Sequence, residues 1–264
     1  MAARSALYNV MERAARKAAR GLVRDFGEVE NLQVSMKGPA DFVSTADYQS
    51  EKILRQELGK ARPDFGFLME ESGEEKGRDG RHRWIVDPLD GTTNFLHGIP
   101  HFAISIAVER EGEIIAGLVY EPTRDEMFYA EKGFGAFVND RRLRVSARAN
   151  LGDAVIGTGI PFRERGDHPA YLKLLAAVMG KTAGTRRFGA AALDLAYVAA
   201  GRFDGFFEIG LSPWDIAAGL ILVREAGGTV SDIDGNRDVL NRGNVVAATD
   251  RDRKSTRMNS SHGY

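Results

Sequence analysis

Cysteine and long apolar runs are both absent from this chain of 264 residues. The lack of cysteine excludes disulfides, thiolate metal ligands and a cysteine nucleophile, and it fits a protein of the reducing cytoplasm. No apolar run approaches the ~18 residues that would span a bilayer, so a membrane partner is not expected. The formal net charge of −1 gives no overall attraction to nucleic acid. We therefore predict a cytoplasmic protein.

Several sequence signatures of catalysis are missing as well. The five histidines include no HExxH, which argues against a zinc hydrolase. No GxSxG turn is present to carry a serine nucleophile. The Gly-Lys-Thr at 180–182 lacks the upstream glycine of a phosphate-binding loop, because position 175 is leucine. Carboxylates are left as the main candidates for chemistry.

The apolar residues that are present predict a layered fold. They make up 43% of the chain, enough to fill a core. The pattern predicts helices at 4–26, 46–60, 168–179, 189–201 and 212–228. Strands are predicted at 65–70, 84–87, 103–110, 113–122, 126–133, 154–159 and 203–210, with a polar loop at 73–83. Runs of strands mixed with segregated helices indicate an α+β layered architecture rather than a simple α/β alternation.

The stretch WIVDPLDGTTNF at 84–95 ends an apolar run on two aspartates, Asp87 and Asp90. Pro88 restrains Asp87 to an extended backbone, and Gly91 permits a sharp turn after Asp90. The two carboxylates would then converge with the backbone carbonyl of Leu89 between them. Hard divalent cations such as Mg²⁺ prefer this mixture of oxygen ligands.

The residues that follow could bind an anion beside that cation. The amides of Gly91, Thr92 and Thr93 would open a helix, and a helix N-terminus is a site for phosphate. A cation site next to an anion site suggests a phosphate ester bound to metal. The alternative is an aspartate that caps a helix in an ordinary loop.

Further acids support the first interpretation. Glu70 and Glu71 close the strand predicted at 65–70, and Asp215 begins a helix after Trp214. Each alone is typical of a solvated strand end or a helix-dipole partner. Together with the aspartates of the 84–95 stretch they could hold two cations, the arrangement used for in-line displacement at phosphorus.

At this point the sequence resembles the inositol monophosphatase family. WIVDPLDGTTNF matches its first signature, and WDIAAGLILVREAGG at 214–228 matches its second. The segments 37–47, 70–72 and 189–210 fall in the family's order and spacing, so the resemblance covers roughly residues 5–250. It implies an αβαβα sandwich, usually a homodimer, that hydrolyses myo-inositol monophosphates with Mg²⁺.

Carried over by position, the resemblance assigns the metal ligands. Glu70, Asp87 and the Leu89 carbonyl would hold a first ion. Asp87, Asp90 and Asp215 would hold a second, with Asp87 as the bridge. Two or three Mg²⁺ ions per active site are implied, and Li⁺ is expected to inhibit.

The resemblance also assigns the attacking water and the substrate. Thr92, hydrogen-bonded to Asp47, would act with Glu70 to orient and deprotonate the water. The residues implied to bind substrate are Gly91, Thr92 and Thr93 around the phosphate, the backbone near Ala191, and Glu208 at the inositol hydroxyls. Lys37 would lie near the metal entrance.

Two departures from the family are visible. Ala190 stands where many relatives have a substrate-facing serine or threonine. After residue 250 the chain shows no apolar periodicity where the family has a helix, so residues 251–264 are predicted to be a disordered or extraneous tail. We place a single domain at 1–250, with an N-terminal half to about 140 and a C-terminal half from about 141.

Two alternatives remain open on sequence alone. The substrate could be another phosphate monoester, such as fructose 1,6-bisphosphate, histidinol phosphate or a 3′-phosphonucleotide. The protein could instead be a transcription-associated binding protein of the same fold. The Arg-rich stretch at 139–148 is the one local feature that favours this alternative, although a solvated hairpin explains it better because the net charge is near zero.

Overall fold

A computed structural model describes residues 5–28, 34–36, 42–161 and 166–249 of the chain. Lys37 and the predicted tail at 251–264 lie outside the described residues. The helices are α1 (Ala6–Phe26), α2 (Thr45–Ala61), α3 (Thr92–Leu96), α4 (His168–Met179), α5 (Ala191–Ala199), α6 (Pro213–Glu225) and α7 (Val239–Arg242). None of them is long and apolar enough to cross a membrane, within the part of the chain that is described.

The first large sheet is built by the N-terminal half of the chain. Its strands are β3 (Gly66–Met69), β4 (Gly73–Glu75), β5 (His82–Asp90), β6 (Ala103–Arg110), β7 (Glu113–Glu121), β8 (Glu126–Glu131), β9 (Gly135–Val138) and β10 (Arg141–Arg142). Their spatial order is β10-β9-β8-β7-β6-β5-β3-β4. All neighbours are antiparallel except β3 and β5, which run parallel.

The second large sheet is built by the C-terminal half. It comprises β11 (Val155–Thr158), β12 (Gly184–Arg186), β13 (Gly205–Glu208), β14 (Gly228–Ser231) and β15 (Val245–Thr249), in the order β12-β11-β13-β15-β14. Strand β11 is parallel to both of its neighbours, and β15 is antiparallel to both of its own. A separate pair of strands, β1 (Val34–Met36) and β2 (Phe42–Ser44), precedes α2.

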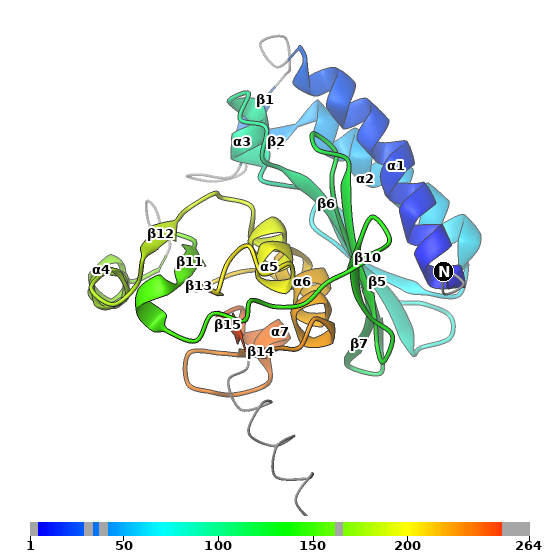
Figure 1. Ribbon diagram of the computed structural model, residues 1–264. Helices are drawn as coiled ribbons and strands as arrows, with labels where there is room; N and C mark the ends of the chain where they lie inside the picture. Colours follow the sequence, from blue (N-terminus) through cyan, green and yellow to red (C-terminus); the bar gives the residue numbers. More distant parts are fainter. Residues whose placement is uncertain (1–4, 29–33, 37–41, 162–165, 250–264) are drawn as a thin grey trace, which may run out of the picture.

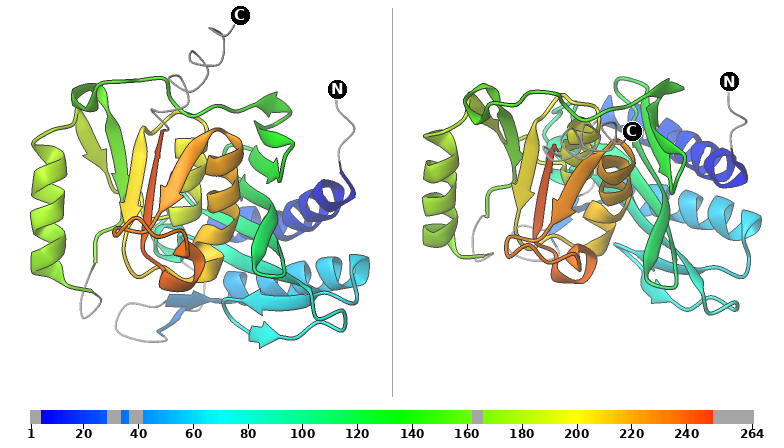
Figure 2. Two further views of the ribbon diagram at one scale, coloured as in Figure 1. Left: turned by 90° about the horizontal axis from the view of Figure 1, so that it is seen from below. Right: turned by 60° about the horizontal axis from the view of Figure 1, so that its bottom comes forward.

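The elements stack in five layers (Figures 1 and 2). Helices α1 and α2 cover one face of the eight-stranded sheet, α5 and α6 lie between the two sheets, and α4 lies on the far face of the five-stranded sheet. Strand β5 shows why both faces are covered: Trp84 and Val86 join the cluster under α1, whereas Ile85 joins the cluster around α5 and α6. Successive side chains of a strand alternate between faces. The order helix, sheet, helix, sheet, helix agrees with the prediction.

The middle layer is packed closely because its helices carry small residues. All of α5 is buried. At Gly219 of α6, a Cβ atom would lie only 2.4 Å from Leu195 of α5. Glycine at this position therefore lets the two helix backbones approach, which brings the N-termini of α5 and α6 to the same edge of the first sheet.

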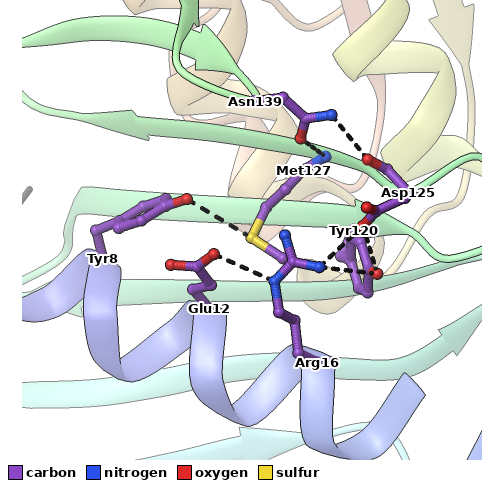
Figure 3. A network of polar contacts seen from close by, with 7 residues as sticks. All are labelled: Tyr8, Glu12, Arg16, Tyr120, Asp125, Met127 and Asn139. Carbon is purple, nitrogen blue, oxygen red and sulfur yellow. Dashed lines mark hydrogen bonds and ion pairs between the residues drawn. The ribbon is translucent and has the colours of Figure 1, made fainter. Parts of the chain in front are cut away.

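Helix α1 is held to the first sheet by a polar network as well as by its apolar face (Figure 3). Arg16 donates to Glu12, to Asp125 at 2.9 Å and to the Tyr120 hydroxyl, and Tyr120 in turn donates to Asp125. Arg16 and Asp125 are substantially exposed, so their ion pair stabilises the fold by at most about 1 kcal/mol. The buried alanines and leucine of α1 provide the larger share of its docking energy.

Several elements differ from the sequence-based expectation. The segment 73–83, predicted to be a loop, contains β4 and the start of β5. The helix predicted at 212–228 ends at Glu225, and β14 begins at Gly228. Strands β12 and β15 were not predicted. Short strands such as these depend on pairing with neighbours rather than on a periodic pattern of their own.

Candidate active site

Strand β5 carries two aspartates that a regular strand would point to opposite faces, since they are three residues apart. Asp87 pairs with Ser105 of β6 and Asp90 pairs with Ala103, so β5 takes three steps where β6 takes two. This is a β-bulge with one additional residue in β5. Because Ser105 and Ala103 share a face, the bulge turns both aspartates toward α5 and α6.

Pro88 and Leu89 build the bulge. Pro88 has no N–H to donate to the ladder, and its carbonyl accepts a hydrogen bond of 2.8 Å from Ser50 Oγ of α2. The Leu89 N–H donates to Asp87 Oδ1 at 2.9 Å, as in an Asx turn. The backbone groups that leave the ladder are thus still hydrogen-bonded, although the bulge is buried.

The Leu89 carbonyl meets the side chain of Thr92. Thr92 Oγ1 donates to it at 2.9 Å and lies 3.5 Å from Asp47 Oδ2. A hydroxyl has one proton, so the shorter contact is the stronger one, and the contact with Asp47 is at the outer limit of a hydrogen bond. Thr92 and Asp47 are neighbours as predicted, but the threonine proton is directed mainly to the Leu89 carbonyl.

Glu70 reaches the same place from the neighbouring strand. Strand β3 runs parallel to β5 with Met69 opposite Val86, so the next step places Glu70 beside Asp87. Carboxylate oxygens of Asp47, Glu70 and Glu71 lie within 4.8 Å of one another, close enough to hold a metal ion. Glu71 was counted in the sequence among the acids that could hold cations, although the family resemblance gave it no role. The structure places it in this group.

Asp215 comes from the start of α6. Its Oδ2 accepts a hydrogen bond of 2.7 Å from the Ser212 N–H, and together they form a capping box. Asp215 therefore does cap its helix, the simpler of its two interpretations. It also lies near Asp87, and its negative charge contributes to raising the pKa of Asp87.

Helix α5 is tied to Asp90. Its N-cap residue, Ala190, has no side-chain oxygen, and the Ala192 N–H donates instead to Asp90 Oδ2 at 2.8 Å. The Ala191 N–H contributes to the same carboxylate. Asp90 thus supplies the oxygen that a capping serine or threonine would give. Ala191, predicted to meet substrate through its backbone, directs its N–H to this aspartate.

Burial and mutual repulsion dominate the electrostatics of this acid cluster. Burial raises the pKa of Asp87 well above its usual range, and the charges of Glu70, Asp90, Asp215 and Asp47 raise it further. Burial also raises the pKa of Asp90 to about 7, in spite of the hydrogen bond from Ala192. Carboxylates in such proximity resist full ionisation unless a cation offsets their charge.

The donor set fits a hard divalent cation. The ligand atoms described above are all oxygens, from carboxylates and from one peptide carbonyl. Mg²⁺ binds such oxygen ligands through a few carboxylates and retains water or substrate oxygens for the remainder. The pKa values of the aspartates are raised because their negative charges are buried close together, and a bound cation would offset these charges.

Gly91 makes the turn that follows Asp90. Its φ is 90°, and a Cβ atom there would lie 3.0 Å from the His101 carbonyl oxygen and 3.3 Å from the Ala190 Cβ. Glycine alone satisfies both the left-handed backbone and the close approach. Helix α3 then begins at Thr92 and spans five residues. An anion here would be bound by the free amides of the first turn, at Thr92 and Thr93, more than by the dipole of so short a helix.

Glu208 ends β13 on the opposite side of the cluster. Burial and the charge of Asp215 raise its pKa to about 7, and the charge of Arg187 opposes this shift. Among the described ion pairs, none joins Glu208 to Arg187, so the arginine influences the carboxylate from a distance. Within the described part of the chain, no hydrogen bond or ion pair holds the Glu208 carboxylate.

A second buried acid near Glu208 was missed in the sequence. Asp194 of α5 is 1% exposed, and burial raises its pKa well above the usual range, with further contributions from Glu208 and Asp90. The helical pattern of α5 gave no reason to separate this aspartate from an ordinary surface residue. It adds a further buried acid behind the cluster.

A groove of about 530 Å³ lies away from these acids, on the five-stranded sheet beside α4. Its one acid among the described lining residues is Asp204, which pairs with Arg148 at 3.1 Å. The groove is mostly apolar and its acid is held in an ion pair, so the acid cluster is the candidate active site.

Comparison with known proteins gives consistent matches over nearly the whole chain. The model of the inositol monophosphatase family matches residues 3–262. An inositol-1-monophosphatase from Mesorhizobium japonicum is 64% identical over 248 residues, which cover 94% of this chain and 93% of the relative. The Nus factor SuhB of Pseudomonas aeruginosa is 46% identical over 91% of this chain and 90% of its own length.

A solved structure shows the same fold. The crystal structure of the extragenic suppressor protein suhB from Bartonella henselae has a TM-score of 0.91 and 59% identity, and the match covers 98% of this chain and 100% of that chain. This likeness confirms the predicted α+β sandwich. The family match extends past residue 250, so the domain end that we placed there stays a prediction.

Proposed function

Because the chain belongs to the inositol monophosphatase family, we propose that it is a Mg²⁺-dependent phosphatase that hydrolyses myo-inositol monophosphates to inositol and phosphate. The observation that carries the proposal is the convergence of Asp87 and Asp90 on one face through the β5 bulge. In a regular strand with the same three-residue spacing, one of the two aspartates would face α1 and α2 instead. A buried concentration of acids is costly for a fold and is retained here for the charge that it binds.

The residues divide into ligands and positioning groups. Glu70, Asp87 and the Leu89 carbonyl would hold one cation, and Asp87, Asp90 and Asp215 a second. Bound Mg²⁺ would supply a water of lowered pKa and offset negative charge on the phosphate and the leaving oxygen.

The protein's own groups then act on the water and the phosphate. Glu70 would accept a proton from the attacking water. Thr92 keeps its own proton on the Leu89 carbonyl or Asp47, so a lone pair of its hydroxyl oxygen is free to accept from that water. The free amides at Gly91, Thr92 and Thr93 would bind phosphate oxygens. Such groups stabilise developing charge without reorganising during the reaction.

Metal removal tests the proposed reaction. Phosphate release from inositol 1-phosphate is expected with Mg²⁺ and is expected to fall at least about a hundredfold after treatment with EDTA, because the barrier rises by at least about 2.7 kcal/mol. Readdition of Mg²⁺ should restore turnover, and Li⁺ should inhibit it. Undiminished hydrolysis in EDTA would refute a metal-dependent mechanism.

Glu208 is proposed to select the alcohol part of the substrate. Glu208→Gln is expected to lower kcat/KM for inositol 1-phosphate about tenfold or more, and to change that for p-nitrophenyl phosphate within about twofold. A carboxylate accepts two hydroxyl hydrogen bonds, whereas an amide offers one acceptor. Glu113→Gln, at an exposed acid that begins β7, is the matched control. An equal loss on both substrates would remove Glu208 from the selectivity pocket.

A binding function in transcription is the alternative from another class. It is favoured by relatives named Nus factors, and Arg141, Arg142 and Arg144 do expose a basic hairpin on this chain. The two functions separate in one experiment: Asp87→Asn should abolish phosphatase activity, whereas binding to the transcription machinery through the hairpin would survive it. We further propose, from the family resemblance, a homodimer in the cytoplasm, which sedimentation analysis and cell fractionation would test.

A further inference from the structure

We infer that Gly159 is a positioning residue for Glu208, and that its missing side chain creates the space in which the Glu208 carboxylate lies. The size of residue 159 would thereby set the selectivity of the enzyme for polyol phosphates. The inference rests on the proposed function, in which Glu208 binds substrate hydroxyls.

The contact is direct. A Cβ atom built on Gly159 would lie 1.8 Å from both Cδ and Oε1 of Glu208, and 2.3 Å from Oε2. These are the three nearest atoms, and all belong to one carboxylate. The φ of Gly159 is outside the left-handed region, so its φ angle does not by itself require glycine. The need for glycine here arises from Glu208.

The strand register explains why the two residues meet. Strands β11 and β13 are parallel, with Thr158 opposite Phe207. One step further along both strands, Gly159 and Glu208 become neighbours on the same face. The Glu208 side chain can therefore lie across residue 159, but only if that residue has no side chain.

The backbone that leads into residue 159 is held by buried hydrogen bonds. Thr158 Oγ1 donates to the Gly159 carbonyl at 3.1 Å and is hydrogen-bonded to the Tyr171 hydroxyl at 2.9 Å. Thr158 is 1% exposed and Tyr171 is 3% exposed. The Tyr171 ring also packs on Phe207, at 6.0 Å between ring centroids. This buried arrangement holds the β11 end in place.

The carboxylate, by contrast, can move. It is the end of a flexible side chain, and no described residue makes a hydrogen bond or an ion pair with it. Carbon atoms pack at about 3.5–4.0 Å, so an alanine at 159 would displace it by roughly 1.5 Å or more. Displacements of about 1 Å can reduce the rate of a positioned reaction a hundredfold. Gly159→Ala should therefore change selectivity and leave the fold intact.

The test measures kcat/KM with Mg²⁺ on inositol 1-phosphate and p-nitrophenyl phosphate. Gly159→Ala is expected to lose about tenfold or more on inositol 1-phosphate, mainly through KM, and to stay within about twofold on p-nitrophenyl phosphate. Gly152→Ala is the matched control, because a Cβ atom there meets nothing within 4 Å and its φ is also outside the left-handed region. This control should match the wild type on both substrates.

A double-mutant cycle tests whether the loss caused by Gly159→Ala acts through Glu208. In a Glu208→Ala background, Gly159→Ala is expected to cause no further loss on inositol 1-phosphate. An additional loss in that background, or an equal loss on both substrates in the single variant, would overturn the inference. If the wild type shows no preference for inositol 1-phosphate, the proposed selectivity is what fails. A crystal structure of Gly159→Ala then decides: a displaced Glu208 carboxylate supports the positioning role, and an unmoved one overturns it.

Discussion

Asp87→Asn is expected to abolish hydrolysis of inositol 1-phosphate, with a loss of about a thousandfold or more, while the fold stays intact. Asp87 lies at the centre of the acid cluster, 2% exposed, and the charges of four other acids act on it. In the proposed mechanism it would be a ligand of both cations, so its neutralisation would weaken the binding of both. Each factor of ten in rate corresponds to about 1.4 kcal/mol, so a thousandfold loss corresponds to about 4 kcal/mol.

The experiment combines steady-state kinetics with a titration of bound Mg²⁺ by calorimetry. The Leu89 N–H can still donate to the asparagine oxygen, so circular dichroism should show an unchanged fold. Asp64→Asn, at an exposed acid before β3, is the control and should retain full activity. Activity within a few-fold of the wild type, with unchanged metal stoichiometry, would contradict the two-cation assignment.

Asp90→Asn is expected to have two opposite effects, a loss of activity and a gain in stability of the metal-free protein. Activity should fall about a hundredfold or more, because one ligand of the second cation loses its charge. The metal-free protein should gain at least about 1 kcal/mol in free energy of unfolding at pH 8, since one pKa unit corresponds to about 1.4 kcal/mol. The melting temperature would rise by about 2–4 °C for each kcal/mol.

The raised pKa of Asp90 explains why its replacement should stabilise the metal-free protein at high pH. Burial raises the pKa of Asp90 from 3.8 to about 7 in the folded protein. The folded state therefore binds more protons than the unfolded state between these values, and the stability from this group is lost as pH rises through that range. The asparagine variant does not lose this stability. Its free energy of unfolding should therefore exceed that of the wild type at pH 8 and be nearly equal to it near pH 4.

Thermal melts in EDTA at both pH values provide the measurement. The Ala192 N–H can donate to the asparagine oxygen, so the cap of α5 is retained. Asp64→Asn should leave the melting temperature unchanged at both pH values. A variant that is less stable than the wild type at pH 8 would show that the Asp90 carboxylate stabilises the metal-free fold, contrary to the raised pKa.

Much of this site could be predicted from the order of residues alone. The Asp-Pro-Leu-Asp-Gly-Thr-Thr run at 87–93 indicates a polar turn that offers oxygen ligands, because proline and glycine restrict and permit specific backbone angles. The apolar periods of α1, α2 and α4 predicted those helices within a few residues. The runs of strands mixed with segregated helices also predicted the layered architecture. These features are local, or follow from patterns along one segment.

Other features depend on pairing between distant segments. The sequence spaces Asp87 and Asp90 as if for opposite faces, and only the pairing of β5 with β6 introduces the bulge that brings them together. The parallel register of β3 and β5 places Glu70 beside Asp87, which no periodicity of either strand could indicate.

The sequence by itself thus determined the composition, the residues that form the turn after β5 and the apolar periodicity of the helices. The tertiary structure decided which acids share a face, which amides cap which carboxylate, and why position 159 has no side chain. Such outcomes depend on the register between strands and on close packing across layers, both of which arise only when the chain has folded. The Asp90 carboxylate at the N-terminus of α5 and the Glu208 carboxylate across Gly159 both depend on contacts between remote parts of the chain.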